Sequence, residues 1–364
     1  MSVQVTNYQC PNCDGALRYV GASGKLECGH CDSKFDVALI EQLYADKEKK
    51  AVAAGVEQQW DITQTTNFSA EEAAHMRGYL CPSCAAEMIC DDTTAATSCH
   101  YCGNPAVVPG QFSEQLRPDY VLPFKLDKKS AVEALKKYYK GKRFLPKAFA
   151  EDNHIDEIKG VYVPFWLFDA ESEADMLFRG TRVRVYTTGD YQITETDHYR
   201  VKREGNITFE KVPVDAFSKM PDAHMDSIEP FDYGGLAAFS MAYLPGYLAD
   251  KYDRDAGACS KRANERIRAS TETMFRGTAT GYATLRAEYS HIHLKKGDVK
   301  YALLPVWLLS TQWNGKNFLF AMNGQSGKLI GDLPVDWGKF FAWFAGLSLP
   351  LMGILAAVLF GGAI

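Results

Sequence analysis

The arrangement of the cysteines constrains this chain more than any other feature of its sequence. Eight of the ten cysteines form two sets with the same spacing: a CxxC pair, fourteen intervening residues and a second CxxC pair. Two residues between paired cysteines make a tight turn that directs both sulfurs to one point, and two such turns complete the tetrahedron that Zn²⁺ prefers. The predicted ligands are Cys10, Cys13, Cys28 and Cys31 for one zinc ion and Cys81, Cys84, Cys99 and Cys102 for the other.

The spacing also bears on the kind of metal site. A single CxxC is equally typical of a redox pair, but two full quartets favour metal binding. His30 and His100 lie between ligand cysteines, so the exchange of one sulfur for an imidazole is the alternative ligand set. Four protein ligands leave no open position for water, and both zinc ions are therefore predicted to be structural. Cys90 and Cys259 have no partner at ligand spacing and are interpreted as free thiols.

Composition indicates the setting of these sites. The chain has 364 residues, of which 46% are hydrophobic and 23% charged, enough for two or three folded domains. The net charge of −5 gives no global reason to expect a nucleic-acid partner. Residues 1–7 are polar and lack the basic start and apolar run of a secretory signal. We therefore expect reduced thiols in the cytosol and not a disulfide framework.

An uncharged segment closes the sequence. Residues 340–364 contain no Asp, Glu, Lys or Arg, and as a helix they extend about 37 Å, more than the roughly 30 Å of a bilayer core. We interpret 339–364 as a single transmembrane anchor; a buried core helix is the alternative. Lys339 and the zinc thiolates predict a cytoplasmic location for the soluble part. Aromatic residues, which favour the membrane interface, cluster at the start of the segment: Trp337, Phe340, Phe341 and Trp343.

These features predict an α+β protein with two small β modules. The expected domains are a zinc ribbon at 1–40, a helical spacer at 41–75, a second ribbon at 76–112, an α+β body at 113–338 and the anchor at 339–364. Within the spacer, Ser69 and Glu72 have the spacing of a capping box. In the body, Ser130 and Glu133 have the same spacing and predict a helix over 131–140.

The rest of the body is expected to alternate strands with one long helical stretch. Glycines at 180, 189 and 205 are interpreted as breaks between strands. A faint recurrence of Pro and aromatic residues predicts a duplicated unit, 121–214 and 228–332, with chance recurrence as the alternative. The helical stretch is expected over 236–276, and the strands over 161–168, 176–186, 191–202, 207–214, 282–293, 299–312, 318–322 and 328–331.

The sequence has no recognisable catalytic motif. It lacks a phosphate-binding loop, a GxGxxG after a strand and a nucleophile elbow. His291 and His293 share one face of a predicted strand, but no third metal ligand lies near them in sequence. We therefore expect neither enzymatic activity nor a small-molecule substrate.

The paired cysteine turns resemble the zinc ribbons of general transcription factor IIB. Their charges disfavour nucleic acid, since phosphate binding needs a basic surface. Residues 1–40 carry three basic against four acidic side chains, and residues 76–112 carry one against three. A zinc ion with four thiolates adds a formal −2 at each site.

The whole chain resembles a bacterial family of membrane-anchored proteins with two zinc ribbons. Two N-terminal ribbons, the segment 244–253, the Pro-x-Trp strands and the final apolar helix carry this resemblance. Members are encoded beside phage-shock-protein-A-like and stomatin-like (SPFH) proteins, which implies that the family docks soluble partners at the cytoplasmic membrane under membrane stress.

We accordingly expect an adaptor that docks protein partners at the membrane through the tips of its cysteine turns. Pro11, Asn12, Gly29 and His30 form the tips in one ribbon, and Pro82, Ser83, His100 and Tyr101 those in the other. The alternatives are a nucleic-acid-associated factor of the transcription or replication type, and an enzyme with an unrecognised site in the body. The segment 113–150 carries ten basic against four acidic residues, and its cations are expected either to be solvated or to contact anionic headgroups.

Overall fold

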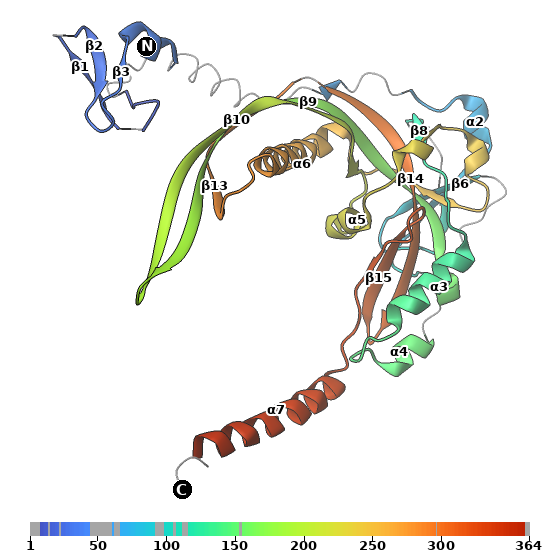
Figure 1. The fold of residues 1–364 in the computed structure, drawn as a ribbon. Coiled ribbons are helices and arrows are strands. Elements are labelled where there is room, and N and C mark those ends of the chain that lie inside the picture. The colour runs from blue at the N-terminus through green and yellow to red at the C-terminus, as the bar shows by residue number, and fades with distance from the viewer. Residues whose placement is uncertain are drawn as a thin grey trace. The chain divides into compact units, whose positions relative to one another are not determined.

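The computed structural model describes residues 8–13, 15–21, 23–43, 60, 61, 66–91, 98–104, 107–110, 116–152, 155–295 and 297–360. It is a mixed α+β structure, as predicted, and its strands form one small and one large sheet (Figure 1). The chain forms two compact units, one of Met1–Gln59, Glu171–Thr208 and Ile267–Lys296, the other of Trp60–Ala170, Phe209–Arg266 and Gly297–Ile364. Residues 44–59 and 62–65 of the predicted helical spacer lie outside the described residues.

The first unit contains a three-stranded sheet at the N-terminus. Strands β1 (Leu17–Val20), β2 (Lys25–Cys28) and β3 (Lys34–Phe35) pair in that order, antiparallel throughout. The core beneath them consists of Leu17, Leu26 and Ile40 together with the sulfurs of Cys10 and Cys28. Three aliphatic side chains are a small core, so this module depends on whatever links its cysteines.

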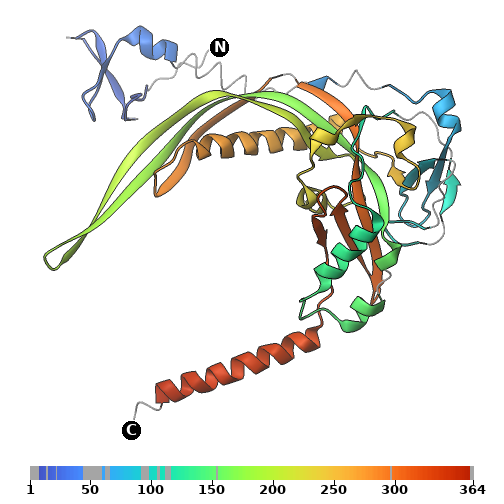
Figure 2. The same ribbon diagram turned by 45° about the vertical axis from the view of Figure 1, so that its right-hand side comes forward.

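The same unit contains most of a long hairpin. Strands β9 (Lys159–Thr188) and β10 (Tyr191–Asp215) are continuous where four shorter strands were expected. The prediction of a break at Gly180 was wrong, because this glycine serves packing: a Cβ there would lie 2.6 Å from the Tyr282 ring. Only Gly189, with φ +58°, makes the turn. Strand β13 (Thr284–Leu294) pairs with β9, and the second half of α6 (Ala256–Gly277) runs along the hairpin (Figures 1 and 2).

The second unit is built around four strands: β8 (Tyr120–Val121), β14 (Gly297–Trp313), β9 and β12 (Leu248–Asp250). The central pair, β14 and β9, is antiparallel with Val163 opposite Leu304. On the outside, β8 runs parallel to β14 and β12 runs parallel to β9. The register is therefore two-fold symmetric about the central pair. The duplication stays a prediction, and this symmetry makes β12 the counterpart of β8.

Two helix starts in this unit test the predicted caps. Helix α2 (Ala70–Ala74) has the expected capping box between Ser69 and Glu72. Helix α3 (Lys128–Tyr139) begins earlier than predicted, because the Asp127 carboxylate accepts the Ser130 N–H at 2.8 Å and caps the helix. Ser130 is therefore not the cap. A carboxylate in this place also interacts favourably with the positive end of the helix dipole.

The expected helical stretch over 236–276 is correct only for its second part. Helix α6 begins at Ala256, and Pro245 and Gly246, with φ +83° at the glycine, end any helix before β12. The preceding segment holds α5 (Asp222–Ile228), η2 (Tyr233–Gly235), β11 (Ala237–Ala238) and η3 (Met241–Tyr243). The remaining elements are β4 (Trp60–Asp61), β5 (Met76–Leu80), β6 (Glu87–Asp91), β7 (Val108–Gly110), α4 (Lys147–Asp152), η1 (Ile155–Glu157), β15 (Lys316–Asn323), β16 (Leu329–Gly331) and α7 (Trp337–Phe360).

A partly buried ion-pair network joins α6 to the end of β10 and to α5. Asp215 is 1% exposed and pairs with the Arg262 guanidinium. Arg262 also reaches Asp222 at 3.1 Å and Asp226 at 2.6 Å. Burial raises the pKa of Asp215, against the attraction of Arg262. Arg254, 3.8 Å from the other Asp215 oxygen, opposes the effect of burial in the same way.

Substitution of Arg262 by Leu is expected to lower the free energy of unfolding by about 2–3 kcal/mol at pH 7, because the buried Asp215 carboxylate loses its closest partner and keeps only Arg254, at 3.8 Å. Where a carboxyl has a raised pKa in the folded state, the free energy of unfolding increases as the pH falls toward that pKa. The loss of stability caused by the substitution should therefore be smaller at pH 5. Urea denaturation at both pH values measures this. The control is Arg276→Leu, which removes an exposed pair with Glu272 at 2.7 Å and should cost under about 0.5 kcal/mol. Equal losses in the two variants would contradict the expectation.

Candidate metal centres

The cysteine turns share one backbone design. In the three turns described in full, the amide of the first cysteine donates to the carbonyl five residues later, and the amide four residues later donates back to that cysteine. The residue four positions after the first cysteine has positive φ: Asp32 (54°), Ala85 (56°) and Gly103 (71°). A left-handed residue that is not glycine costs about 1 kcal/mol or more. The same positive φ recurs in all three turns, which indicates that the convergence of the sulfurs determines the backbone conformation of the turn.

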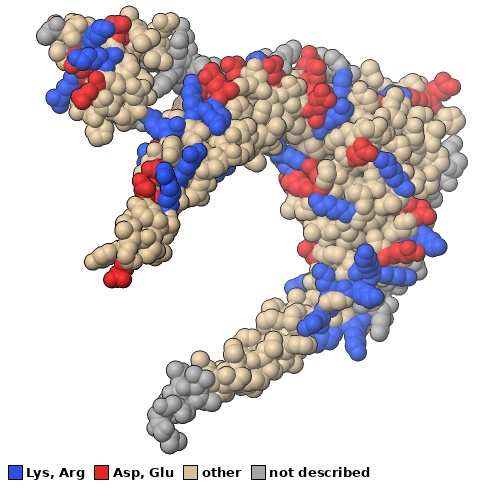
Figure 3. All heavy atoms as spheres, in the orientation of Figure 1, with Lys and Arg blue, Asp and Glu red and all other residues tan. Residues whose placement is uncertain are grey.

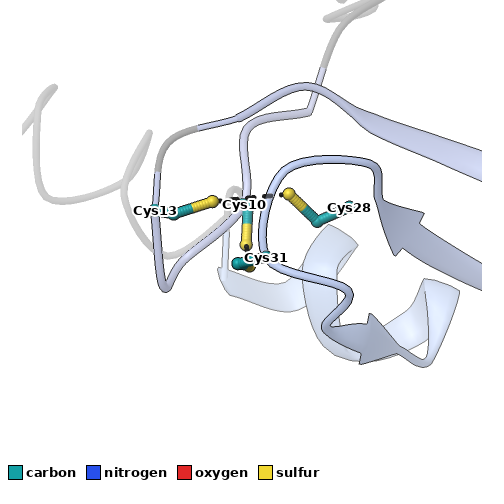
Figure 4. A group of neighbouring side chains, drawn as sticks. All are labelled: Cys10, Cys13, Cys28 and Cys31. Atoms are coloured by element: carbon teal, nitrogen blue, oxygen red, sulfur yellow. Dashed lines mark hydrogen bonds between the residues drawn. The ribbon is translucent and has the colours of Figure 1, made fainter.

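Both predicted quartets converge. In the first, the Cys10 and Cys31 sulfurs lie 3.6 Å apart and those of Cys13 and Cys28 lie 3.4 Å apart (Figure 4). In the second, the equivalent pairs, Cys81–Cys102 and Cys84–Cys99, are both 3.6 Å apart. All sulfurs within a quartet lie within 4.8 Å of one another. Tetrahedral zinc with Zn–S bonds of about 2.3 Å requires sulfur separations of about 3.8 Å, so each group fits a metal ion of this kind.

Without metal, the thiols of the two quartets differ in their affinity for protons. The Ser33 hydroxyl, 3.2 Å from the sulfur, lowers the pKa of exposed Cys31 to about 6. Burial raises the pKa of Cys84 to about 11. A metal ion must therefore displace protons from some of its ligands, and its affinity should fall as the pH is lowered.

The first ribbon presents its turn tips to solvent. Pro11, Asn12, Gly29 and His30 are all exposed. Of the small residues in these turns, Gly15 is required by close approach, because a Cβ there would lie 3.0 Å from the Cys28 sulfur. Gly29 has open space around it.

The second ribbon is integrated into the large sheet. Its strands β5 and β6 pair with each other, and β6 pairs with β12, placing Ile89 opposite Ala249. Cys81 and Cys99 belong to the same buried cluster as Phe165 and Phe217. This four-cysteine group is thus part of the core of the second unit.

One aspartate fixes the tip of the second CxxC turn of this ribbon. Asp250, on β12, lies 2.9 Å from His100 Nε2 and accepts the Tyr101 hydroxyl with its other oxygen. Burial and this carboxylate raise the pKa of Tyr101, so the phenol stays protonated and donates. Tyr101 also stacks on Phe217, with ring centroids 5.0 Å apart. Close by, the Lys159 ammonium donates to the Ser98 carbonyl at 2.9 Å.

These contacts correct two expectations. The His100 Nε2 atom faces Asp250, so the alternative ligand set with His100 in place of a sulfur is not what the structure brings together. His100 and Tyr101 are only 3% and 7% exposed, so they do not form the exposed tip that was expected, whereas Pro82 and Ser83 are exposed. Asp250 was missed because nothing in its local pattern links it to a histidine 150 positions away.

The C-terminal helix has the properties of a membrane span. From Trp337 to Leu355, α7 has a mean hydropathy of 1.4 and none of it is buried. It is the one such candidate in the part of the chain that the structure describes; residues 361–364 of the predicted anchor lie outside that part. At its start, the Asp336 carboxylate accepts the Lys339 N–H at 3.0 Å.

Comparison with known proteins places the chain among relatives of one bacterial protein. No family model matches it and no solved structure matches it. It is 36% identical over 344 residues to the uncharacterized protein YdjG of Bacillus subtilis (strain 168), and the match covers 94% of each chain. At this identity and coverage, the chain belongs to the same family as YdjG.

Proposed function

We propose that this chain is a zinc-binding adaptor, anchored in the cell membrane by α7, that docks protein partners on the cytoplasmic side. The observation that carries this is the combination of two closed four-cysteine groups with one long, unburied apolar helix. Closed sites hold a scaffold in shape and offer no position for a substrate. Thiolate ligands favour a reducing compartment, which supports a cytoplasmic body.

The first ribbon is the proposed docking module. Its turn tips are exposed, and so are Tyr19, at 62%, and Leu39, at 50%. A rigid module that presents such side chains loses little entropy on binding. The second ribbon has the structural role, since one of its two turn tips is buried against Asp250.

The charges of the first ribbon favour a protein over a nucleic acid. Lys25 lies 3.5 Å from Asp36, and Lys34 lies 2.9 Å from Glu27, so these cations are already neutralised. Figure 3 shows basic and acidic side chains intermixed on this module. The family resemblance described above adds a class of partner, an oligomeric phage-shock-protein-A-like or stomatin-like protein, in membrane stress.

A matched pair of tip variants tests this function. His30 and Ser83 occupy the same place in their turns, the second residue between two cysteines, and both are exposed. His30→Asp should weaken partner recovery from detergent-solubilised membranes at least about fivefold, the effect of losing a contact worth more than 1 kcal/mol. Ser83→Asp should leave recovery unchanged. Equal recovery of the partner with both variants would refute the proposal. So would a wild-type protein that recovers nucleic acid and no protein partner.

A further inference from the structure

A groove of about 370 Å³ lies at the start of α7. One wall is the loop 141–145 and the other is the segment of Leu333, Pro334 and Val335. Its volume is at the lower end of the range for small-molecule sites. Most of its side chains are apolar, and its two charged ones, Lys142 and Arg143, are exposed.

The loop is attached directly to the membrane helix. The Asp336 amide donates to the Phe144 carbonyl at 2.8 Å, and the Lys339 ammonium donates to the Leu145 carbonyl at 2.8 Å. The Phe144 ring packs edge-on against Phe340, with centroids 5.6 Å apart. These contacts fix the groove relative to the first turn of α7, where a spanning helix enters the lipid headgroups.

Cations surround this groove. Figure 3 shows basic side chains gathered where α7 joins the rest of its unit. The Arg143 guanidinium lies over the Trp343 ring, 5.1 Å from its centroid, and the Lys142 ammonium lies 4.9 Å from that of Tyr138. Within the described residues, none of the exposed cations of α3, α4 and this loop is paired with a carboxylate. They are Lys128, Lys129, Lys136, Lys137, Lys140, Lys142, Arg143 and Lys147.

We infer that this groove binds one anionic phospholipid of the cytoplasmic leaflet. Lys142 and Arg143 face the headgroup phosphate, and the apolar walls at Phe144, Leu333 and Val335 contact the glycerol and the first methylenes. Unpaired cations beside an apolar surface complement a molecule that is anionic at one end and apolar at the other. The inference rests on the proposed membrane anchorage through α7, because only a spanning helix holds the groove at headgroup depth.

The test uses the full chain in detergent, with native mass spectrometry to count retained lipid. Wild-type protein should retain one phosphatidylglycerol and should not retain phosphatidylcholine. Lys142→Gln with Arg143→Gln keeps part of each side-chain stem but removes both charges, and should weaken retention about 30-fold. The matched control is Lys219→Gln with Lys261→Gln, two exposed lysines on other elements, which should retain lipid normally. Circular dichroism checks that each variant is folded.

A second pair of variants tests the apolar wall. Val335→Asp places a negative charge in the groove and should abolish retention, whereas Val183→Asp, at a residue with the same 47% exposure, should not. Inorganic phosphate should not compete, because it lacks the apolar part. Equal retention of phosphatidylcholine, competition by phosphate, or normal retention in Lys142→Gln/Arg143→Gln overturns the inference. If one of these outcomes occurs while wild-type protein is in the membrane fraction, the lipid site is refuted and the proposed anchor stands. If wild-type protein is in the soluble fraction, the proposed anchorage itself fails.

Discussion

Removal of residues 338–364 is expected to move the protein from the membrane fraction to the soluble fraction, with its fold retained. From Trp337 to Leu355, α7 contributes no buried residue. The truncation removes the Lys339–Leu145 hydrogen bond, the Phe144–Phe340 ring contact and the Arg143–Trp343 cation–π contact, besides the Asp336 cap of α7 itself. The expected cost to the free energy of unfolding is therefore only about 2–3 kcal/mol. By contrast, a span of about 20 apolar residues holds a protein in a bilayer essentially irreversibly.

Fractionation of cells that express both forms measures this, with circular dichroism and urea denaturation of the truncated protein as the check on folding. A chain in which α7 is replaced by an unrelated apolar helix of equal length is the control, and it should return to the membrane. A full-length protein in the soluble fraction would contradict the assignment of α7. A truncated protein that aggregates would indicate that α7 covers part of the core.

Local sequence patterns predicted the features that depend on near neighbours. The CxxC spacing brings two sulfurs together within one turn, so the membership of both quartets could be read before the fold was known. The capping box at Ser69 and the uncharged segment of α7 are equally local. The predicted start of α3 was wrong by one turn, because Asp127 and Ser130 are both suitable N-cap residues.

Features that depend on distant pairing could not be predicted in this way. Gly180 has the composition of a break between strands, but its lack of a side chain makes room for Tyr282. The pairing of β6 with β12 joins Ile89 to Ala249, and no local pattern encodes it. For that reason, the second ribbon was expected to be an independent module, and the burial of His100 against Asp250 was not foreseen.

This integration predicts that the two metal centres have very different weights in the stability of the protein. Wild-type protein is expected to hold two equivalents of zinc, and Cys13→Ser and Cys84→Ser should each lose one. The two residues are matched: each is the second cysteine of its ribbon and each is half-buried. The measurement is zinc content by mass spectrometry, together with urea denaturation followed by tryptophan fluorescence. Less than one equivalent in metal-replete wild type would refute zinc binding.

The consequences for folding should differ between the two variants. Loss of zinc from the first ribbon should unfold a module whose core is Leu17, Leu26 and Ile40, and leave the main transition within about 0.5 kcal/mol of wild type. Loss from the second ribbon frees Cys81 and Cys99 inside the cluster that contains Phe165, and no metal then joins the three remaining cysteines.

Structural zinc in small domains contributes about 10–16 kcal/mol, and whole domains have a net stability of about 5–15 kcal/mol. Even a partial loss through Cys84→Ser should therefore lower the main transition by several kcal/mol, and chelation of wild-type protein should do the same. The ordering of effects follows from the pairing of β6 with β12. If Cys84→Ser left the main transition unchanged, the second ribbon would have to fold independently of that sheet, and the roles assigned to the two ribbons would have to be exchanged or abandoned.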